Sequence, residues 1–254
     1  EPAEALRARA AALGATALAD ASQIGADVAP RLVVFAVKPQ VVLDIVPAYA
    51  RFRDGATFVS VAAGTPIAAF ERLLGAGAAV IRCMPNTPAA IGKGMMVTVA
   101  NAHVAQAAAA FVRDLLSASG RVAEIADEGL MDAVTAVSGS GPAYVFHFIE
   151  CLTAAGEAAG LPADTARLLA MQTVYGAAAL AAESGEEPGE LRRQVTSPNG
   201  TTAAALSVLM GEDRLKALIG EGVEALVERV WRVELFVERR CIIAGVGLKE
   251  GAAL

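Results

Sequence analysis

The chain has 254 residues, enough for one large domain or two modest ones, and its net charge of −6 with dispersed basic residues argues against a nucleic-acid partner. Its mean hydropathy is +0.50, but the best candidate for a membrane span, residues 143–161, carries His147, Glu150 and Glu157, and the start Glu1-Pro2 is unlike a signal peptide. We therefore expect no membrane span, and three widely spaced cysteines predict reduced thiols in a cytoplasmic protein without a metal site.

The first half of the chain alternates short apolar runs with helix-like segments. Runs that are rich in β-branched residues and do not alternate with polar ones are typical of strands buried on both faces. Alternation of such strands with helices predicts a parallel sheet covered by helices. The predicted strands are residues 32–37, 57–63, 78–84, 95–99 and 121–125. The predicted helices are residues 3–12, 40–50, 66–74 and 102–119.

After residue 124 the strand-like runs stop and helical segments follow one another. Pro142 and Pro188 lie where a proline is tolerated, in the first turn of a helix. The predicted fold class is therefore α/β followed by all-α. The predicted helices of this half are residues 128–137, 142–159, 163–183, 188–194, 201–210 and 213–240.

Tight segments with small residues and prolines follow the first three predicted strands, at residues 37–39, 60–66 and 82–88. In open parallel sheets, ligands bind outside the carboxyl ends of the strands. We expect a ligand site there, with Lys38 and Asn86 supplying directional polar contacts. The alternative is that all three segments are ordinary strand–helix turns.

Dinucleotide sites of this class begin with a strand and a Gly-x-Gly-x-x-Gly turn, which admits a pyrophosphate to a helix N-terminus. The sequence contains no such motif and opens with Glu1-Pro2 and a helical stretch, as a Rossmann fold entered after its second strand would. Hydrogen bonds to charged groups contribute about 1.5–3 kcal/mol each. We therefore expect this chain to bind NAD(P)H at least about a hundredfold more weakly than a chain with the loop.

Four motifs, in this order and spacing, carry a resemblance to a known family. They are Ala36-Val37-Lys38-Pro39-Gln40, Met84-Pro85-Asn86-Thr87-Pro88, the segment Asp132 to Tyr144, and the segment Val195 to Thr202. With these motifs the chain resembles the pyrroline-5-carboxylate reductases. The resemblance implies an oxidoreductase of proline biosynthesis that reduces 1-pyrroline-5-carboxylate to L-proline with NADPH or NADH.

The resemblance also implies an architecture and an assembly. An incomplete Rossmann parallel-sheet domain that binds NAD(P), residues 1–124, would be followed by a helical dimerisation and substrate domain, residues 125–254. The expected assembly is a homodimer, which in the family often builds decameric rings. The active site is expected to be shared between the nucleotide domain of one subunit and helices of its partner.

The site residues are carried over in the same way. The Thr202 hydroxyl is expected to hydrogen-bond the ring nitrogen of the substrate and to assist its protonation, which makes Thr202 the candidate catalytic residue. Glu128 is expected near the substrate, and N–H groups of the loop before Thr202 near its carboxylate. The implied substrate-binding residues are Glu128, Gln194, Val195, Ser197, Gly200, Thr201 and Thr202. The implied cofactor-binding residues are Ala36, Val37, Lys38, Pro39, Ala62, Ala63 and Asn86.

From the residues alone, blander interpretations stay open for three of these features. A threonine at position 202 could be a plain helix N-cap, and Glu128 could be a first-turn acid that interacts with the helix dipole. Residues 138–141, Ser-Gly-Ser-Gly, join two predicted helices, so we interpret them as a tight helix–helix corner that shapes the pocket and not as a phosphate loop.

The chain departs from the family's pattern at three places. Asn199 stands where glycine is usual, and asparagine tolerates a left-handed backbone there. Asp20-Ala21 lies where the family often has an asparagine that contacts the cofactor ribose. Residues 231–254 are foreign to the family, and could be an extra helix, a disordered extension or the product of an altered reading frame.

Two other functions are alternatives to an active reductase. A truncated, catalytically weak homologue would only fold and oligomerise through its helical half. A β-hydroxyacid dehydrogenase is disfavoured, because those enzymes use a lysine on the long interdomain helix and no lysine occurs between Lys93 and Lys216.

Overall fold

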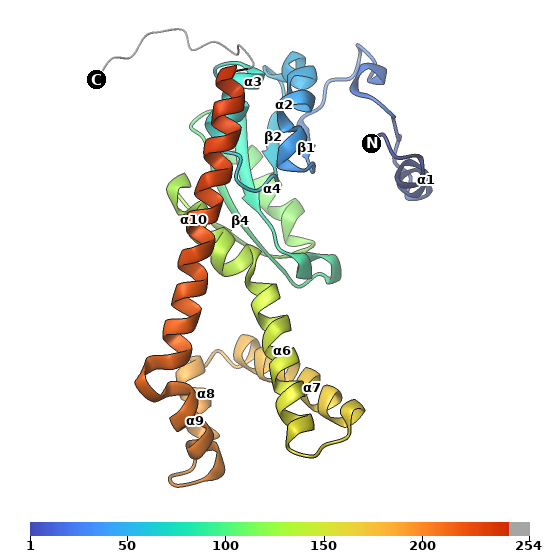
Figure 1. The fold of residues 1–254 in the computed structure, drawn as a ribbon. Coiled ribbons are helices and arrows are strands. Elements are labelled where there is room, and N and C mark those ends of the chain that lie inside the picture. The colour runs from blue at the N-terminus through green and yellow to red at the C-terminus, as the bar shows by residue number, and fades with distance from the viewer. Residues whose placement is uncertain (244–254) are drawn as a thin grey trace, which may run out of the picture. The chain divides into compact units, whose positions relative to one another are not determined.

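The structure, a computed structural model, describes the backbone of residues 1–243 and the side chains of residues 1–230. The chain forms two compact units, one of residues 1–135 with the helical residues from Val227 onward, and one of Ala136–Leu226 (Figure 1). The predicted domain limits, 1–124 and 125–254, stay a prediction. The helices and strands of the first unit are α1 (Glu4–Ala12), β1 (Leu32–Phe35), α2 (Val42–Ile45), β2 (Thr57–Ser60), α3 (Ile67–Leu74), β3 (Ala79–Met84), β4 (Gly94–Ala100), α4 (Gln106–Ser117), β5 (Gly120–Glu124) and α5 (Met131–Val134).

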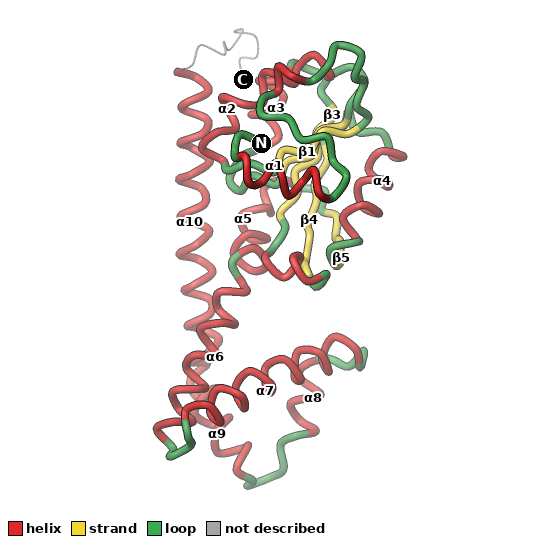
Figure 2. Tube along the Cα trace, turned by 90° about the vertical axis from the view of Figure 1, so that its right-hand side faces the viewer, coloured by secondary structure: helices red, strands yellow, loops and turns green. Residues whose placement is uncertain are grey.

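The five strands form one sheet in the order β1-β2-β3-β4-β5, drawn in yellow in Figure 2. Neighbouring strands are parallel except for β3 and β4, which are antiparallel, so the prediction of a wholly parallel sheet is wrong at this pair. The reason is the short connection between them, residues 85–93. A parallel crossover needs about a dozen residues or more, so this connection can only return the chain in the opposite direction.

Helices cover both faces of the sheet. On one face, α2 and α3 pack against β1, β2 and β3, with Phe58 and Phe70 fully buried in the shared core. On the other face lies α4 (Figure 2), whose Val112 is buried in a core with residues of β3 and β4. The prediction that the strands are buried on both faces is wrong for β1, because it lies at the sheet edge and the side chain of Val34 is 49% exposed.

The predicted helix over residues 40–50 is broken into shorter pieces. The structure has a 3-10 helix at Pro39–Val41, the four residues of α2, and a second 3-10 helix at Val46–Phe52. Proline lacks an N–H group and disrupts an α-helix from inside. Pro47 therefore limits α2 to a single turn.

Two glycines make a close backbone approach where β4 and β5 begin. Gly94 pairs with Gly120, whose φ is 148°, and a Cβ on Gly120 would lie 2.0 Å from the carbonyl oxygen of Gly94. We expect Gly120→Ala to lower the free energy of unfolding by about 3 kcal/mol, from backbone strain and overpacking together. Urea unfolding followed by circular dichroism measures the loss. Gly55→Ala is the matched control, because nothing lies within 4 Å of its Cβ position, and equal stability of the two variants would contradict the prediction.

The second unit is helical throughout. Its elements are a π-helical turn (Thr135–Gly139) that leads in from the first unit, α6 (Gly141–Ala158), α7 (Ala163–Glu183), α8 (Pro188–Gln194), α9 (Thr201–Met210) and the first part of α10 (Arg214–Ile243). The predicted limits of α7, α8 and α9 are confirmed to the residue. α10 continues through the predicted tail as far as Ile243, and residues 244–254 lie outside the described part of the chain.

Few residues of the helical unit are buried. Within residues 136–226, the buried residues are Ala136, Ala166 and Ala170. Large apolar side chains are instead exposed, among them Leu168 and Tyr175, each 68% exposed. A monomer rarely exposes this much apolar surface, so the unit has the surface of a protein–protein interface.

The described helices include none that is long and apolar enough to cross a membrane. Burial raises the pKa of the Cys83 thiol to about 12, whereas Cys151 is exposed. Neither described thiol forms a disulfide bond.

Candidate functional site

The loops predicted to bind a dinucleotide all follow the carboxyl ends of parallel strands. β1, β2 and β3 are parallel neighbours, so the residues that follow these strands lie side by side at their carboxyl ends. The residues concerned are Ala36, Val37, Lys38 and Pro39 after β1, Ala62 and Ala63 after β2, and Asn86 after β3. The structure therefore brings the predicted cofactor residues together at the carboxyl ends of these strands. Their contact with the cofactor stays a prediction.

A hollow of about 620 Å³ opens beside the end of β1. Ala36 and Val37 line it together with Asp20, Asp44 and Tyr49. Small side chains at a strand end and a carboxylate across the hollow are the features that Rossmann folds offer to the ribose half of a dinucleotide. The residues present thus fit such a group.

Asp20 is held in place by its own turn. Its Oδ1 accepts a hydrogen bond from the backbone N–H of Ser22 at 2.8 Å, and the Gln23 side chain accepts in return from the backbone of Asp20 at 3.2 Å. Hydrogen bonding from the Ser22 side chain, and then from the Ser22 backbone, lowers the pKa of the Asp20 carboxyl. The hollow therefore faces a fixed negative charge.

Asn86 and Ala62 are fixed by local backbone bonds. The side-chain oxygen of Asn86 accepts from the N–H of Met95 at 2.9 Å and so ties the loop after β3 to β4. The N–H of Ala62 donates to the Ser60 hydroxyl at 3.2 Å, and the Ala62 side chain is buried. Ala62 therefore presents backbone to a ligand, and Asn86 supports the loop on which it lies.

Glu128, the predicted substrate residue of the first unit, joins two parts of that unit. Its Oε1 accepts from the backbone N–H of Ile67, the first residue of α3, at 2.8 Å and from Nη1 of Arg82 on β3 at 2.9 Å. The Arg82 side chain is 5% exposed and that of Glu128 is 29% exposed. The interpretation of Glu128 as a first-turn acid of its own helix is incomplete, because its carboxylate bonds to the start of another helix.

Arg82 was not among the predicted site residues. Burial raises the pKa of the Asp132 carboxyl, and the nearby charge of Arg82 opposes that rise, so Arg82 acts on both Glu128 and Asp132. The signal in the sequence was a single arginine inside the apolar run of residues 78–84. A buried charge requires a partner, so this residue could have been identified.

In the second unit, residues 197–200 form the turn that precedes α9. The N–H of Gly200 donates to the carbonyl of Ser197 at 3.1 Å, and Asn199 has a φ of 57°, the left-handed backbone that asparagine tolerates. Gly200 is the N-cap of α9 and no side chain caps the helix, so Thr202 is not an N-cap. The first amides of a helix have no acceptor within the helix, so this turn presents donors that suit a carboxylate.

The neighbouring predicted substrate residues differ in how they are held. Thr201 is exposed and the Thr202 side chain is half-buried in the first turn of α9. Val195 is 66% exposed, whereas the Gln194 side chain donates to the Glu186 carboxylate and is committed to that contact. Substrate contacts of these residues, and of Ser197 and Gly200, stay predictions.

The Ser-Gly-Ser-Gly segment forms no tight corner in its first part. Residues 135–139 form a π-helical turn, Ser140 keeps helical backbone angles, and α6 begins at Gly141. The Thr135 hydroxyl donates to the Met131 carbonyl at 2.8 Å and supports the turn. The predicted corner is therefore a wide turn within an almost continuous helical run.

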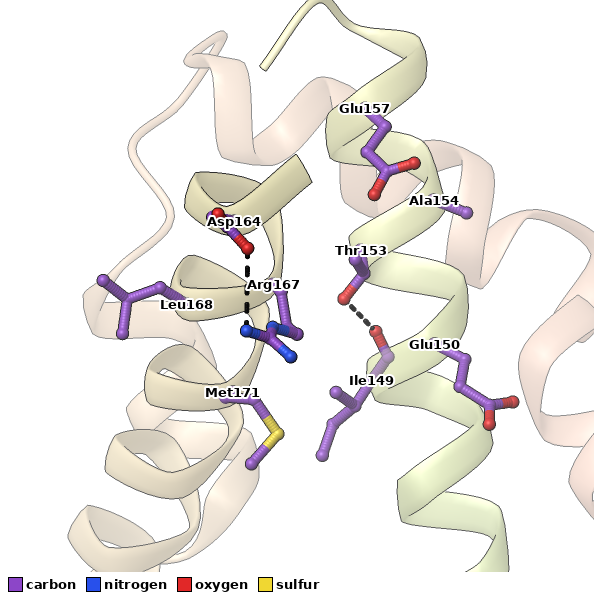
Figure 3. A pocket seen from close by; sticks show the side chains of 9 residues that line it. All are labelled: Ile149, Glu150, Thr153, Ala154, Glu157, Asp164, Arg167, Leu168 and Met171. Atoms are coloured by element: carbon purple, nitrogen blue, oxygen red, sulfur yellow. Dashed lines mark hydrogen bonds and ion pairs between the residues drawn. The ribbon is translucent and has the colours of Figure 1, made fainter. Parts of the chain in front are cut away.

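A second hollow, of about 710 Å³, lies between α6 and α7 (Figure 3). Arg167 of α7 pairs with Asp164 at 3.6 Å on its rim, and Ile149 and Met171 point into it from the two helices. None of the predicted site residues lines this hollow.

Comparison with known proteins assigns the chain to a family. A pyrroline-5-carboxylate reductase of Pseudomonas aeruginosa is 47% identical over 199 residues, which cover 78% of this chain and 70% of that protein. The chain belongs to the pyrroline-5-carboxylate reductase family. The family described as pyrroline-5-carboxylate reductase dimerisation matches residues 128–232, which include the whole helical unit.

Solved structures of pyrroline-5-carboxylate reductases agree with the fold. The one from Coxiella burnetii is 32% identical with a TM-score of 0.84, over 91% of this chain and 85% of that one. The one from Plasmodium falciparum, which has NADP bound, is 30% identical with a TM-score of 0.72, over 80% and 77%. The predicted fold class, a Rossmann-like α/β part followed by a helical dimerisation part, is confirmed.

Proposed function

We propose that this protein reduces 1-pyrroline-5-carboxylate to L-proline with NADH or NADPH, as an enzyme of proline biosynthesis. Its family membership supports the reaction, and the turn before α9 is the feature of the structure that supports it most directly. The substrate has one carboxylate and one ring nitrogen. The uncapped start of α9 offers amide donors for the carboxylate, and the Thr202 hydroxyl lies one residue into the same turn for the nitrogen.

Hydride transfer to a protonated imine requires little of the protein beyond binding and orienting the substrate. A protonated cyclic imine accepts hydride readily, and the nicotinamide supplies that hydride when bound. The residues of this chain must hold the carboxylate, orient the ring and support the charge on its nitrogen. In our proposal Ser197, Gly200 and Thr201 hold the carboxylate, and Thr202 bonds the nitrogen.

The proposed assembly is a homodimer formed through the helical unit, with decamers built from the same dimers. The exposed apolar surface of α7 and the match to a dimerisation family support the dimer. The proposed location is the cytoplasm.

The function is tested by following NADH or NADPH oxidation at 340 nm with 1-pyrroline-5-carboxylate and identifying L-proline by mass spectrometry. Formation of L-proline that depends on both reactants is expected. A chain that oligomerises without turnover would contradict the proposal and would favour the alternative of a homologue that only folds and assembles.

Cofactor preference gives a test of the hollow beside β1. In our proposal the Asp20 carboxylate accepts from the ribose 2′-hydroxyl of NADH and repels the 2′-phosphate of NADPH. We expect Asp20→Asn to raise the ratio of kcat/KM for NADPH to that for NADH about fivefold, the effect of about 1 kcal/mol between charges near 4 Å in water. Asparagine keeps the oxygen that accepts from Ser22.

Asp54→Asn is the control for this change, since Asp54 is an exposed carboxylate paired with Arg53 away from the hollow. An unchanged ratio in Asp20→Asn, or the same change in Asp54→Asn, would remove Asp20 from the cofactor site.

A further inference from the structure

Three exposed side chains of α6 form a chain of contacts that the proposed reduction does not use. Nδ1 of His147 lies 3.0 Å from Oε2 of Glu150, and Nε2 of the same ring lies 3.6 Å from Sγ of Cys151. Residues three and four positions apart lie together on one helix face. All three belong to a single helix of the second unit, so the arrangement is set within that unit.

The two contacts determine which ring nitrogen of His147 carries a proton. A carboxylate can only accept a hydrogen bond, so Nδ1 of His147 donates to Glu150. With one proton on Nδ1, the neutral ring has an acceptor at Nε2, and the Cys151 thiol donates to it. A thiol, a base and a carboxylate that orients the base are the parts of an activated nucleophile.

Metal binding is the other chemistry that histidine, cysteine and glutamate offer, and the geometry disfavours it. The thiol and the carboxylate contact different nitrogens of the imidazole ring, so the three groups do not converge on one ion. Among the side chains that the structure describes, no group of three histidine, cysteine, aspartate or glutamate residues could hold a metal ion. The arrangement therefore supports proton transfer between neighbours.

The other described cysteine has the opposite surroundings. Cys83 lies on β3 and is 2% exposed, and burial raises the pKa of its thiol to about 12. The nucleophile in thiol chemistry is the thiolate, so Cys83 is nearly inert in the folded protein at neutral pH. Cys151 is exposed and has a base within reach, so it is the described thiol that a reagent in solution can use.

We propose that Cys151 is a site of thiol–disulfide exchange with low-molecular-weight disulfides, activated by His147 and Glu150. The Cys151 sulfur attacks one sulfur of the disulfide while Nε2 of His147 takes the thiol proton. A new S–S bond forms on Cys151, and the S–S bond of the reagent breaks. The departing thiolate takes the proton from His147. The Cys151 sulfur is thus oxidised, the departing sulfur is reduced, and Glu150 stabilises the imidazolium ring between the two proton transfers.

Oxidised glutathione is the probe for this reaction. The assembled full chain is incubated with it at neutral pH, and mass spectrometry of proteolytic peptides measures the rate at which glutathione is added to each cysteine. We expect Cys151 to be modified, whereas Cys83 should stay free until the protein is unfolded in urea. Dithiothreitol should remove the glutathione from Cys151, since disulfide exchange is reversible.

Substitution of the two neighbours separates an activated thiol from one that is only exposed. We expect His147→Gln to slow the modification of Cys151 about threefold to fivefold, the range for interactions between exposed groups. Glu150→Gln should slow it about twofold. The double variant should be no slower than His147→Gln alone, because Glu150 acts through the ring and coupled residues are not additive.

Glu157→Gln is the matched control for the change of charge. It removes a carboxylate from the same helix, but ten positions from His147, which is about 15 Å along an α-helix. A general effect of negative charge on the approach of anionic glutathione would appear in this variant as well. The rate of modification of Cys151 should stay at the wild-type value.

Two outcomes would overturn the inference. A wild-type rate in His147→Gln would make Cys151 an ordinary exposed thiol, and a folded wild-type protein that takes up no glutathione at Cys151 would remove the site. The side chains of His147 and Glu150 are 76% and 74% exposed, so their replacement should not disturb folding, which circular dichroism checks. His147→Asn carries the same comparison if His147→Gln fails to fold. Neither outcome bears on the proposed reduction, which does not use these residues.

Discussion

Replacing Leu168 and Tyr175 together with glutamate is expected to convert the assembled protein into monomers. The two residues lie seven positions apart on α7, two helical turns on one face, and each is 68% exposed in the single chain. Burying a large apolar side chain contributes about 1.5–3 kcal/mol. The double variant loses two apolar side chains on each of two subunits and places charges in the interface. We therefore expect the dimer Kd to rise by more than about a thousandfold.

Sedimentation velocity at micromolar concentration measures this change. Phe111→Glu is the matched control, because Phe111 is 58% exposed on α4 and lies outside residues 128–232, the segment that matches the dimerisation family. The control should sediment as the wild type does. A double variant that still sediments as the wild-type species would show that this face of α7 is not the interface.

Thr202→Ala is expected to lower kcat/KM for 1-pyrroline-5-carboxylate by about tenfold to a hundredfold, the effect of losing one hydrogen bond to a charged group. Thr202 lies in the first turn of α9 and does not cap the helix, so removing its hydroxyl breaks no bond in the described structure. The backbone donors for the carboxylate remain. The loss should therefore appear more in kcat than in KM.

Two variants control for this result in steady-state kinetics. Thr202→Ser keeps the hydroxyl and should recover most of the activity. Ser207→Ala removes a hydroxyl of the same helix that donates to the Ala204 carbonyl at 2.7 Å, and should leave the kinetics unchanged. Wild-type kcat in Thr202→Ala would take this residue out of the reaction.

The helices of the second unit were predictable because helix-breaking residues in the local sequence set their limits. Gly160-Leu161-Pro162 and Ser184-Gly185 interrupt an otherwise apolar, alanine-rich run, and the limits of α7 follow from them. The direction of β4 could not be predicted from its own residues, because an apolar run has the same composition in either direction. It depends on the length of the connection before it, which allows only a return.

The candidate site was predictable where a motif lies on one continuous segment, as in the turn from Ser197 to Thr202. The contact of Arg82 with Glu128 was not, since it joins residues 46 positions apart and depends on how β3 and α3 meet the segment after β5. Burial of one charged residue can be inferred from its apolar neighbours. The identity of its partner depends on the tertiary structure.

The scarcity of buried residues in the helical unit has a consequence for how the protein folds. Ala136, Ala166 and Ala170 bury too little apolar area to offset the conformational entropy that six helical segments lose on ordering. In the proposed homodimer, a second copy supplies the apolar surface that stabilises this unit. Refolding then contains a second-order step, the melting temperature rises with protein concentration, and a newly made chain is exposed to proteases until it meets its partner.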